Sequence, residues 1–200
     1  MSRYVIGLTG GIACGKTNLS NALREHGVHV IDADEISRRL TGAGGEALPA
    51  IRAAFGDGVF DGERLDRKAL AREVFGDAKK RERLNSILHP LIFAQMRREM
   101  AEADGPVVLD VPLLFETGLD AWCDEIWCAY VPQKEQIRRL RKREGITGRE
   151  ALARIRAQMP TREKARRAHW VIRTDGSKEQ SASLVLSLWR QTETKGEPQA

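Results

Sequence analysis

The sequence predicts an α/β fold built on a five-stranded parallel sheet with helices on both faces. Five short apolar segments alternate with helical patterns, which is typical of parallel strands joined by helical crossovers. The first of these segments runs directly into a glycine-rich phosphate-binding loop that is followed by a helix. The interval between the second and third segments is almost entirely helical in pattern.

The expected strands are short and bounded by turn residues. They are residues 4–8, 28–31, 107–111, 126–131 and 170–172. In open sheets of this class, ligands bind beyond the carboxyl ends of the strands. The residues that follow each strand are therefore the first candidates for chemistry.

The loop after the first strand has the pattern Gly-x4-Gly-Lys-Thr. It comprises Gly10, Gly11, Ile12, Ala13, Cys14, Gly15, Lys16 and Thr17. Glycines let the backbone curl so that its N–H groups converge on phosphate oxygens. Lys16 can reach the β and γ phosphates of a nucleoside triphosphate, and the Thr17 hydroxyl can bind Mg²⁺. The following helix, which should end near Gly27, adds the positive end of its dipole. We interpret this segment as a nucleotide-binding loop, in preference to a glycine turn without a ligand.

Two carboxylates, Asp32 and Asp34, follow the second strand. A carboxylate at this place could accept the proton of an attacking hydroxyl or hold metal-bound water. Asp34 also precedes an expected helix over residues 35–40 and could cap it, so one residue could serve both purposes. We favour the chemical role.

Asp110 ends the run Val-Val-Leu-Asp within the third expected strand. A hydrophobic strand that ends in an acid often accompanies a phosphate loop, where the acid holds Mg²⁺ directly or through water. A structural carboxylate at a strand end is the alternative. The chain contains no Asn-Lys-x-Asp pattern, so a guanine-specific switch protein would lack its base-reading motif.

The interval between the second and third strands predicts several helices. Asp66 is placed as the N-cap of a helix that should end at Gly76, with flanking leucines as a hydrophobic staple. Another helix should begin after Asp77, and Pro90 suits the first turn of a third helix.

The net charge of +5 is unevenly distributed. Residues 134–167 carry 13 Lys and Arg against four Glu, a balance of +9, so the rest of the chain carries −4. No aromatic residues interleave this segment, and base stacking on it is therefore unsupported. A lid that closes over phosphates and excludes water fits better than a solvated basic helix pair. Arg139 and Arg143 are four residues apart on one helical face and could contact the transferring phosphate.

Helix signals divide the basic segment into three parts. One helix should cover residues 133–144 and stop at Gly145. Thr147 and Glu150 have capping-box spacing for the next helix. Thr161, after a proline that ends this helix, could cap a short third one.

The end of the chain predicts one more helix and a tail. The stretch Ser-Lys-Glu-Gln at 177–180 could open the last helix, and the polar residues 192–200 should be frayed.

Composition narrows the class of protein. Two hundred residues suit one domain with small inserted subdomains. No apolar run approaches the roughly 20 residues that span a membrane, and no signal-peptide core is present, so we expect a cytoplasmic protein without membrane contact. Cys14, Cys123 and Cys128 lack metal-like spacing, and the four histidines form no cluster, so we expect no disulfide framework or structural metal. The Cys14 thiol should be packed or merely accessible rather than catalytic.

Several segments together resemble the dephospho-coenzyme A kinase family. They occur in the family's order between residue 4 and about residue 176: residues 7–12 with 15–17, Asp32-Ala-Asp34, residues 88–91 around His89 and Pro90, residues 110–116, Arg139 with Arg143, and Gln158-Met159-Pro160. The phosphate loop alone is generic. The Asp-x-Asp, His-Pro and Pro-Leu-Leu-Phe-Glu elements together are specific.

This resemblance implies transfer of the γ-phosphoryl group of ATP to the ribose 3′-hydroxyl of dephospho-coenzyme A, with Mg²⁺, in the last step of coenzyme A synthesis. It also implies a three-layer P-loop nucleotide-kinase-like fold in a single domain over residues 1–200. The parts would be a core (1–59, 104–133 and 168–191), a helical acceptor-binding insert (60–103) and a lid (134–167).

The resemblance also assigns roles to the candidate residues. Asp34 would be the catalytic base, with Asp32 beside it. Lys16 would also be catalytic, and Arg139 or Arg143 would stabilise the transferring phosphoryl group. The acceptor would lie against Asp32, Asp34, His89, Leu113 and Glu116, and the metal at Thr17 and Asp110. His89 could equally be a packed residue before a helix.

Four positions depart from the family's usual pattern. Ala13 and Cys14 stand where Gly and a small residue such as Ser are usual, and Ala13 should require a negative φ. His169 and Thr174 stand where Asp and Asn are common, on the side of the adenine, which backbone groups could read instead.

Two other functions compete with this one. A related small-molecule or nucleoside kinase would share the scaffold and differ in its acceptor. A nucleotide-binding regulator or nucleic-acid-associated NTPase would use the basic segment for docking. We expect a small-molecule substrate, no nucleic-acid partner, and a monomer or weak homo-oligomer.

Overall fold

The computed structural model describes residues 3–193 of the chain. The chain forms two compact units, of which the first comprises Met1–Ile31 with Ala103–Ala200 and the second Asp32–Glu102.

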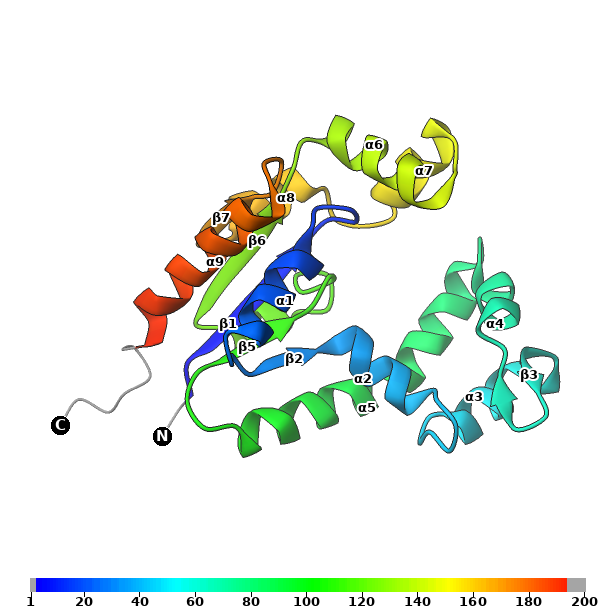
Figure 1. Cartoon of the computed structure of the whole chain (residues 1–200). Helices are drawn as coiled ribbons and strands as arrows, with labels where there is room; N and C mark the ends of the chain where they lie inside the picture. The colour runs from blue at the N-terminus through cyan, green and yellow to red at the C-terminus, as the bar shows by residue number, and fades with distance from the viewer. Residues whose placement is uncertain (1–2, 194–200) are drawn as a thin grey trace. The chain divides into compact units, whose positions relative to one another are not determined.

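The first unit is organised around a five-stranded sheet with the strand order β2-β5-β1-β6-β7 (Figure 1). The strands are β1 (Val5–Gly10), β2 (Val30–Asp32), β5 (Val107–Asp110), β6 (Glu125–Tyr130) and β7 (Trp170–Arg173). Strand β1 pairs in parallel with β5 on one side and β6 on the other, and β6 pairs in parallel with β7. All five predicted strands are confirmed, and so is the α/β fold class.

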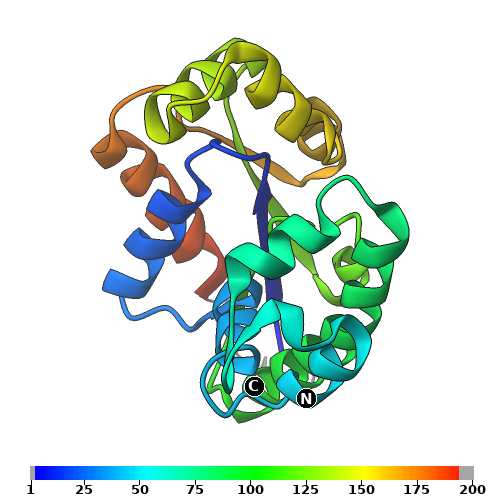
Figure 2. The ribbon, with the colours of Figure 1, turned by 90° about the vertical axis from the view of Figure 1, so that its right-hand side faces the viewer.

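Helices cover this sheet on both faces. Helices α1 (Lys16–Glu25) and α9 (Lys178–Glu193) pack against each other on one face, and α8 (Thr161–Arg167) packs on β1 and β6 from the other (Figure 2). Every residue of β1 is buried, as expected for a strand covered twice. Ile6, Leu8, Leu23 and Trp127 have no exposed surface, and each such side chain contributes about 1.5–3 kcal/mol to folding.

Two helices between β6 and α8 form a small hairpin with a core of its own. They are α6 (Gln133–Glu144) and α7 (Gly148–Arg156), and they pack around Leu140, Ala151 and Ile155. The predicted bounds of α6 and its stop at Gly145, which has φ 67°, are confirmed. The capping box at the start of α7 is also confirmed.

The structure corrects the predicted start of α8 and the predicted start of the C-terminal tail. Thr161 does not cap α8: it is the first helical residue, and its hydroxyl donates to the Gln136 side chain instead. Thr192 is buried within α9 and not frayed, because its hydroxyl donates to the Trp189 carbonyl. The rest of the expected tail, 194–200, lies outside the described residues. The expected opening of α9 is confirmed by reciprocal hydrogen bonds between Ser177 and Gln180.

The second unit is mainly helical. It contains α2 (Ala33–Leu40), α3 (Leu48–Phe55), a 3₁₀ turn η1 (Asp57–Val59), the hairpin β3 (Phe60–Asp61) and β4 (Arg64–Leu65), α4 (Arg67–Val74) and α5 (Ala78–Glu102). A second 3₁₀ turn, η2 (Leu119–Trp122), belongs to the first unit. The predicted N-cap of α4 is confirmed, because the Asp66 carboxylate accepts from the amides of Lys68 and Ala69.

The expected third helix at Pro90 is wrong. Helix α5 continues through Pro90 as one helix of 25 residues. A proline inside a helix removes one backbone hydrogen bond. Here α5 packs along α2, α3 and α4, and buries Ile92 and Met96 beyond the proline, so tertiary packing maintains the helix. In the described part of the chain, no helix is both long and apolar enough to cross a membrane.

Candidate active site

The phosphate loop joins the end of β1 at Gly10 to the start of α1 at Lys16. Gly15 caps α1 in the left-handed region, with φ 79°, which suits glycine. Ala13 also has a positive φ, 62°, so the expectation of a negative angle is wrong. The curl of the loop imposes this angle, at a cost of about 1–2 kcal/mol for a residue with a side chain. The Ala13 methyl group is partly buried against the α6–α7 core, which offsets some of that cost.

Lys16 and Asp110 form a direct ion pair across the start of α1 and the end of β5. The Asp110 side chain is 2% exposed and the Lys16 side chain 14% exposed. Parallel pairing sets Asp110 opposite Leu8, two residues before the loop begins. The sequence predicts that Lys16 binds phosphate and that Asp110 holds Mg²⁺, but it does not predict the ion pair between them.

The donor set around the loop fits Mg²⁺ that arrives with a nucleotide. Thr17 and Asp110 supply a hydroxyl and a carboxylate, which are the oxygen ligands that Mg²⁺ prefers. Thr17 is exposed, and Asp110 is the acid of the neighbouring strand. Within residues 3–193, no group of three or more His, Cys, Asp or Glu could hold a metal alone. Mg²⁺ commonly takes one or two protein ligands and fills its shell with phosphates and water.

Helix α6 and the loop before α8 hold the backbone of the phosphate loop from outside. The Gln136 amide donates to the Ile12 carbonyl at 2.8 Å, and the Gln158 carbonyl accepts from the Ile12 amide at 3.1 Å. The approach is close at Gly11, where a Cβ would lie 2.0 Å from the Thr161 hydroxyl. A side chain at Gly11 would therefore push α8 away from the loop.

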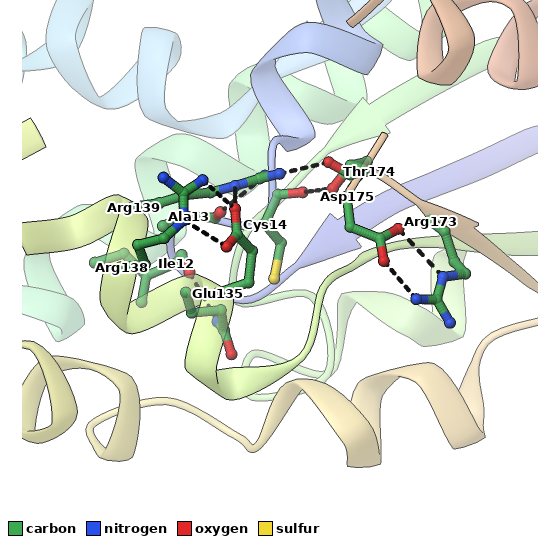
Figure 3. A network of polar contacts seen from close by, with 10 residues as sticks. Ile12, Ala13, Cys14, Glu135, Arg138, Arg139, Arg173, Thr174 and Asp175 are labelled. Carbon is green, nitrogen blue, oxygen red and sulfur yellow. Dashed lines mark hydrogen bonds and ion pairs between the residues drawn. The ribbon is translucent and has the colours of Figure 1, made fainter. Parts of the chain in front are cut away.

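Arg139 links the loop to the end of β7 (Figure 3). Its guanidinium donates to the Ala13 carbonyl at 3.5 Å and to the Thr174 carbonyl at 2.6 Å, and its Nε donates to Glu135 at 2.8 Å. Hydrogen bonds from Arg138 and Arg139 lower the pKa of Glu135 to about 2. Glu135 is thus an anion at neutral pH and holds Arg139 in place.

The two positions expected on the adenine side make backbone contacts. The Thr174 hydroxyl donates to the Cys14 carbonyl of the phosphate loop. His169 accepts a 2.9 Å hydrogen bond from the Ile126 amide through Nδ1, at the entry to β7. Thr174 is therefore part of the loop's support, whereas His169 fixes a strand end.

Arg143 is placed differently from Arg139. Its side chain is 59% exposed and pairs with the adjacent Glu144 at 2.6 Å. The structure brings only Arg139, of the two predicted arginines, into contact with the phosphate loop.

Cys14 is a packed thiol. It is 1% exposed, and its Sγ lies 3.8 Å from the Thr161 hydroxyl. Burial raises the pKa of the Cys14 thiol. The thiolate is therefore disfavoured, in agreement with the predicted non-catalytic role.

The segment 112–116 is bound to α8. Glu116 pairs with the Lys164 ammonium at 2.8 Å and accepts from the Met159 amide at 2.9 Å. Lys164 has no exposed surface. Leu113 is 37% exposed, whereas Leu114 and Phe115 are buried. The sequence analysis did not predict a role for Lys164, because its partners lie about 50 residues earlier in the chain.

In the second unit, Asp32 rather than Asp34 caps α2. The Asp32 Oδ1 accepts from the amides of Asp34 and Glu35 at 2.9 and 3.0 Å. Asp34 is exposed in the first turn of α2, and its carboxylate takes no part in the capping bonds. The capping role considered for Asp34 is thus wrong, and its carboxylate is available for chemistry.

His89 is partly packed and also lines a groove. Its ring stacks on Phe93, with centroids 5.4 Å apart. Burial lowers the pKa of His89, which favours the neutral ring. The groove, of about 640 Å³, lies along the first half of α5, and its lining residues are Ala78, Arg81, Glu82, Asn85, Ser86, His89 and Pro90.

Comparisons with known proteins identify the family and the fold. The sequence model of the family described as dephospho-CoA kinase matches residues 4–180. The dephospho-CoA kinase of Geobacillus kaustophilus is 44% identical over 192 residues, which are 93% of this chain and 95% of that protein. A crystal structure from Thermus thermophilus has a TM-score of 0.82 at 34% identity and covers 96% of this chain and 98% of its own. A shikimate kinase from Acinetobacter baumannii, at 16% identity and a TM-score of 0.54 over 98% of this chain and 97% of its own, shares the fold.

Proposed function

The chain belongs to the dephospho-CoA kinase family, and we propose that it transfers the γ-phosphoryl group of ATP to the ribose 3′-hydroxyl of dephospho-coenzyme A. The products are coenzyme A and ADP, in the final step of coenzyme A synthesis. One observation carries the proposal: the family match spans residues 4–180, and thus includes the phosphate loop, the Asp32–Asp34 pair and segment 112–116.

The phosphate loop binds ATP through its backbone amides and Lys16. Gln136, Gln158 and Arg139 fix the loop from outside, so its shape is set before the nucleotide arrives. Binding requires Lys16 to exchange the Asp110 carboxylate for phosphate oxygens. This exchange would leave the Asp110 carboxylate available to Mg²⁺, so that phosphate binding by Lys16 and metal binding by Asp110 would occur together.

Thr17 and Asp110 would hold Mg²⁺, whose charge neutralises the phosphates when it is bound. Arg139 has a guanidinium beside the loop and is the better placed of the two arginines to assist the transferring group. Arg143 would have to leave Glu144 to do so.

Asp34 serves as the general base. It accepts the proton of the 3′-hydroxyl while that oxygen bonds to the γ-phosphorus and the bond to the β–γ bridging oxygen breaks. Its exposed carboxylate, left out of the α2 cap, supports this role. The proposal requires Asp34 to come within hydrogen-bond reach of the acceptor hydroxyl.

The acceptor binds against Asp32, His89, Leu113 and Glu116, with the insert 60–103 as acceptor-binding region and 134–167 as lid. Four of the ten lid arginines pair with two lid glutamates: Glu135 binds Arg138 and Arg139, and Glu144 binds Arg143 and Arg154. These internal pairs support a lid in preference to a nucleic-acid docking face. We propose a monomer or weak homo-oligomer in the cytoplasm.

ADP release from ATP and Mg²⁺ tests the function, with dephospho-coenzyme A, AMP, adenosine, shikimate and no acceptor compared side by side. Turnover with dephospho-coenzyme A alone would support the proposal. Equal slow hydrolysis in every tube would contradict it. A low-salt gel shift with DNA and RNA should give no retarded band, and a salt-sensitive complex would favour the nucleic-acid alternative.

A further inference from the structure

Helix α8 carries a lysine whose ammonium is fully buried. Lys164 has no exposed side-chain surface, although it is among the residue types that are least often buried. Its Nζ donates to the Pro112 carbonyl at 2.6 Å and to the two Glu116 carboxylate oxygens at 2.8 and 3.1 Å. Both partners belong to one short segment, 112–116, that begins two residues after Asp110. A buried cation needs such partners, so Lys164 and this segment constrain each other.

The segment is attached to its surroundings at further points. The Thr9 hydroxyl, near the end of β1, donates to the same Pro112 carbonyl at 3.1 Å. Arg167, one helical turn after Lys164, lies 4.2 Å from the centre of the Phe115 ring and pairs with Asp120 at 3.0 Å. Residues on both sides of Leu113 are thus held in place, while Leu113 itself faces outward.

The phosphate loop is held by a different set of bonds. Its backbone is bound by Gln136, Gln158 and Arg139, and none of these bonds involves Lys164. Loss of Lys164 should therefore loosen segment 112–116 and leave the nucleotide-binding loop in place.

From these contacts we propose that Lys164 is a positioning residue for the acceptor: it sets segment 112–116 in the conformation that receives the acceptor nucleotide. It does not touch phosphate, because its ammonium is fully used by Pro112 and Glu116. This inference rests on the proposed function, since it takes segment 112–116 as part of the acceptor site. Lys164, which lies in helix α8 of the lid segment 134–167, would thus contribute to acceptor recognition without touching the acceptor.

Lys164→Met tests the inference, because methionine keeps the length of the stem and removes the charge. Arg166→Met is the matched control, on the same helix but 74% exposed at its side chain. We expect the KM for dephospho-coenzyme A to rise about tenfold in Lys164→Met, equivalent to about 1.4 kcal/mol of binding, with the Kd for ATP within about twofold of wild type. Arg166→Met should match wild type in both. Equal losses of ATP and acceptor affinity, or an unchanged acceptor KM, would overturn the proposal.

Hydrogen exchange supplies a readout independent of turnover. In Lys164→Met, amides of residues 111–119 should exchange faster while those of residues 10–18 keep the wild-type rate. Uniformly faster exchange would mean a general loss of stability and would refute a positioning role. If Lys164→Met does not fold, Thr9→Val provides the same test, because it removes the second donor to Pro112 and should raise the acceptor KM about twofold to threefold.

The wild-type enzyme separates the two proposals. If wild type fails to phosphorylate dephospho-coenzyme A, the proposed function fails whatever the variants do. If wild type is active and Lys164→Met has an unchanged acceptor KM, only the positioning role fails.

Discussion

The Arg139 guanidinium donates a 2.6 Å hydrogen bond to the backbone carbonyl of Thr174. Thr174 in turn donates through its hydroxyl to the Cys14 carbonyl, so α6, the end of β7 and the phosphate loop meet at this pair (Figure 3). A lysine ammonium could also donate to a carbonyl. The planar guanidinium of Arg139, however, donates to Thr174, Ala13 and Glu135 through three different nitrogens at once. Arg139 is therefore a support of the loop as well as a candidate partner of the phosphoryl group.

Arg139→Ala should lower ATP affinity about tenfold and also lower kcat, because it removes two donors to the loop region. Arg143→Ala should leave ATP affinity unchanged, since the Arg143 side chain is 59% exposed and pairs with Glu144. Arg138→Ala is the matched control, because it also loses a bond to Glu135, but from a side chain that is 63% exposed. Titration with a fluorescent ATP analogue and steady-state kinetics check this. Equal affinities in all three variants would contradict the assignment.

Lys16→Met should abolish turnover and also destabilise the fold. The Asp110 carboxylate, almost fully buried, would lose its cation, at a cost of about 3 kcal/mol. Lys16→Met combined with Asp110→Asn should recover much of the lost stability and remain inactive. Urea unfolding of the four proteins of this cycle measures the coupling. A double variant no more stable than Lys16→Met would show that the ion pair does not matter to folding.

Asp34→Asn should abolish turnover with unchanged circular dichroism and ATP affinity, because the amide cannot accept the proton. Glu35→Gln, at the next position in the same helical turn, should keep wild-type activity. Asp32→Ala should destabilise α2 by about 1 kcal/mol through loss of its N-cap. Near-normal kcat in Asp34→Asn would rule out this base.

The cysteines should be unreactive in the folded protein. Burial raises the pKa of Cys123 and Cys128 to about 12, and it also raises the pKa of Cys14. At pH 8 the thiolate fraction of a group with a pKa near 12 is roughly one in ten thousand. A thiol reagent should therefore react slowly with the native protein, faster as pH rises, and rapidly with all three thiols in denaturant. Rapid native labelling at pH 8 would mean that the thiols are exposed.

The strands and most helix ends could be predicted because their signals are local. Gly145 and Asp66 act through the backbone of their own turn, and the phosphate loop is one continuous stretch. The helix start expected at Pro90 is wrong because the packing of α5 outweighs the missing hydrogen bond. The negative φ expected at Ala13 is wrong because the curl of the whole loop sets this angle.

The parts of the site that were missed depend on contacts between distant segments. Lys164 meets Pro112 across 52 positions of the chain, and Gln136 meets Ile12 across 124. No spacing in the sequence encodes such pairs. The position of Asp34 after β2 predicts a chemical role, but the sequence does not show that Asp32, rather than Asp34, caps α2.

Transfer to the ribose 3′-hydroxyl is tested most directly by following the γ-phosphate of labelled ATP in the presence of dephospho-coenzyme A. We expect a labelled product, heavier than the acceptor by one phosphate, from which a 3′-specific nucleotidase releases the label. Label in inorganic phosphate alone, or on a position that this nucleotidase cannot cleave, would contradict transfer to the 3′-hydroxyl.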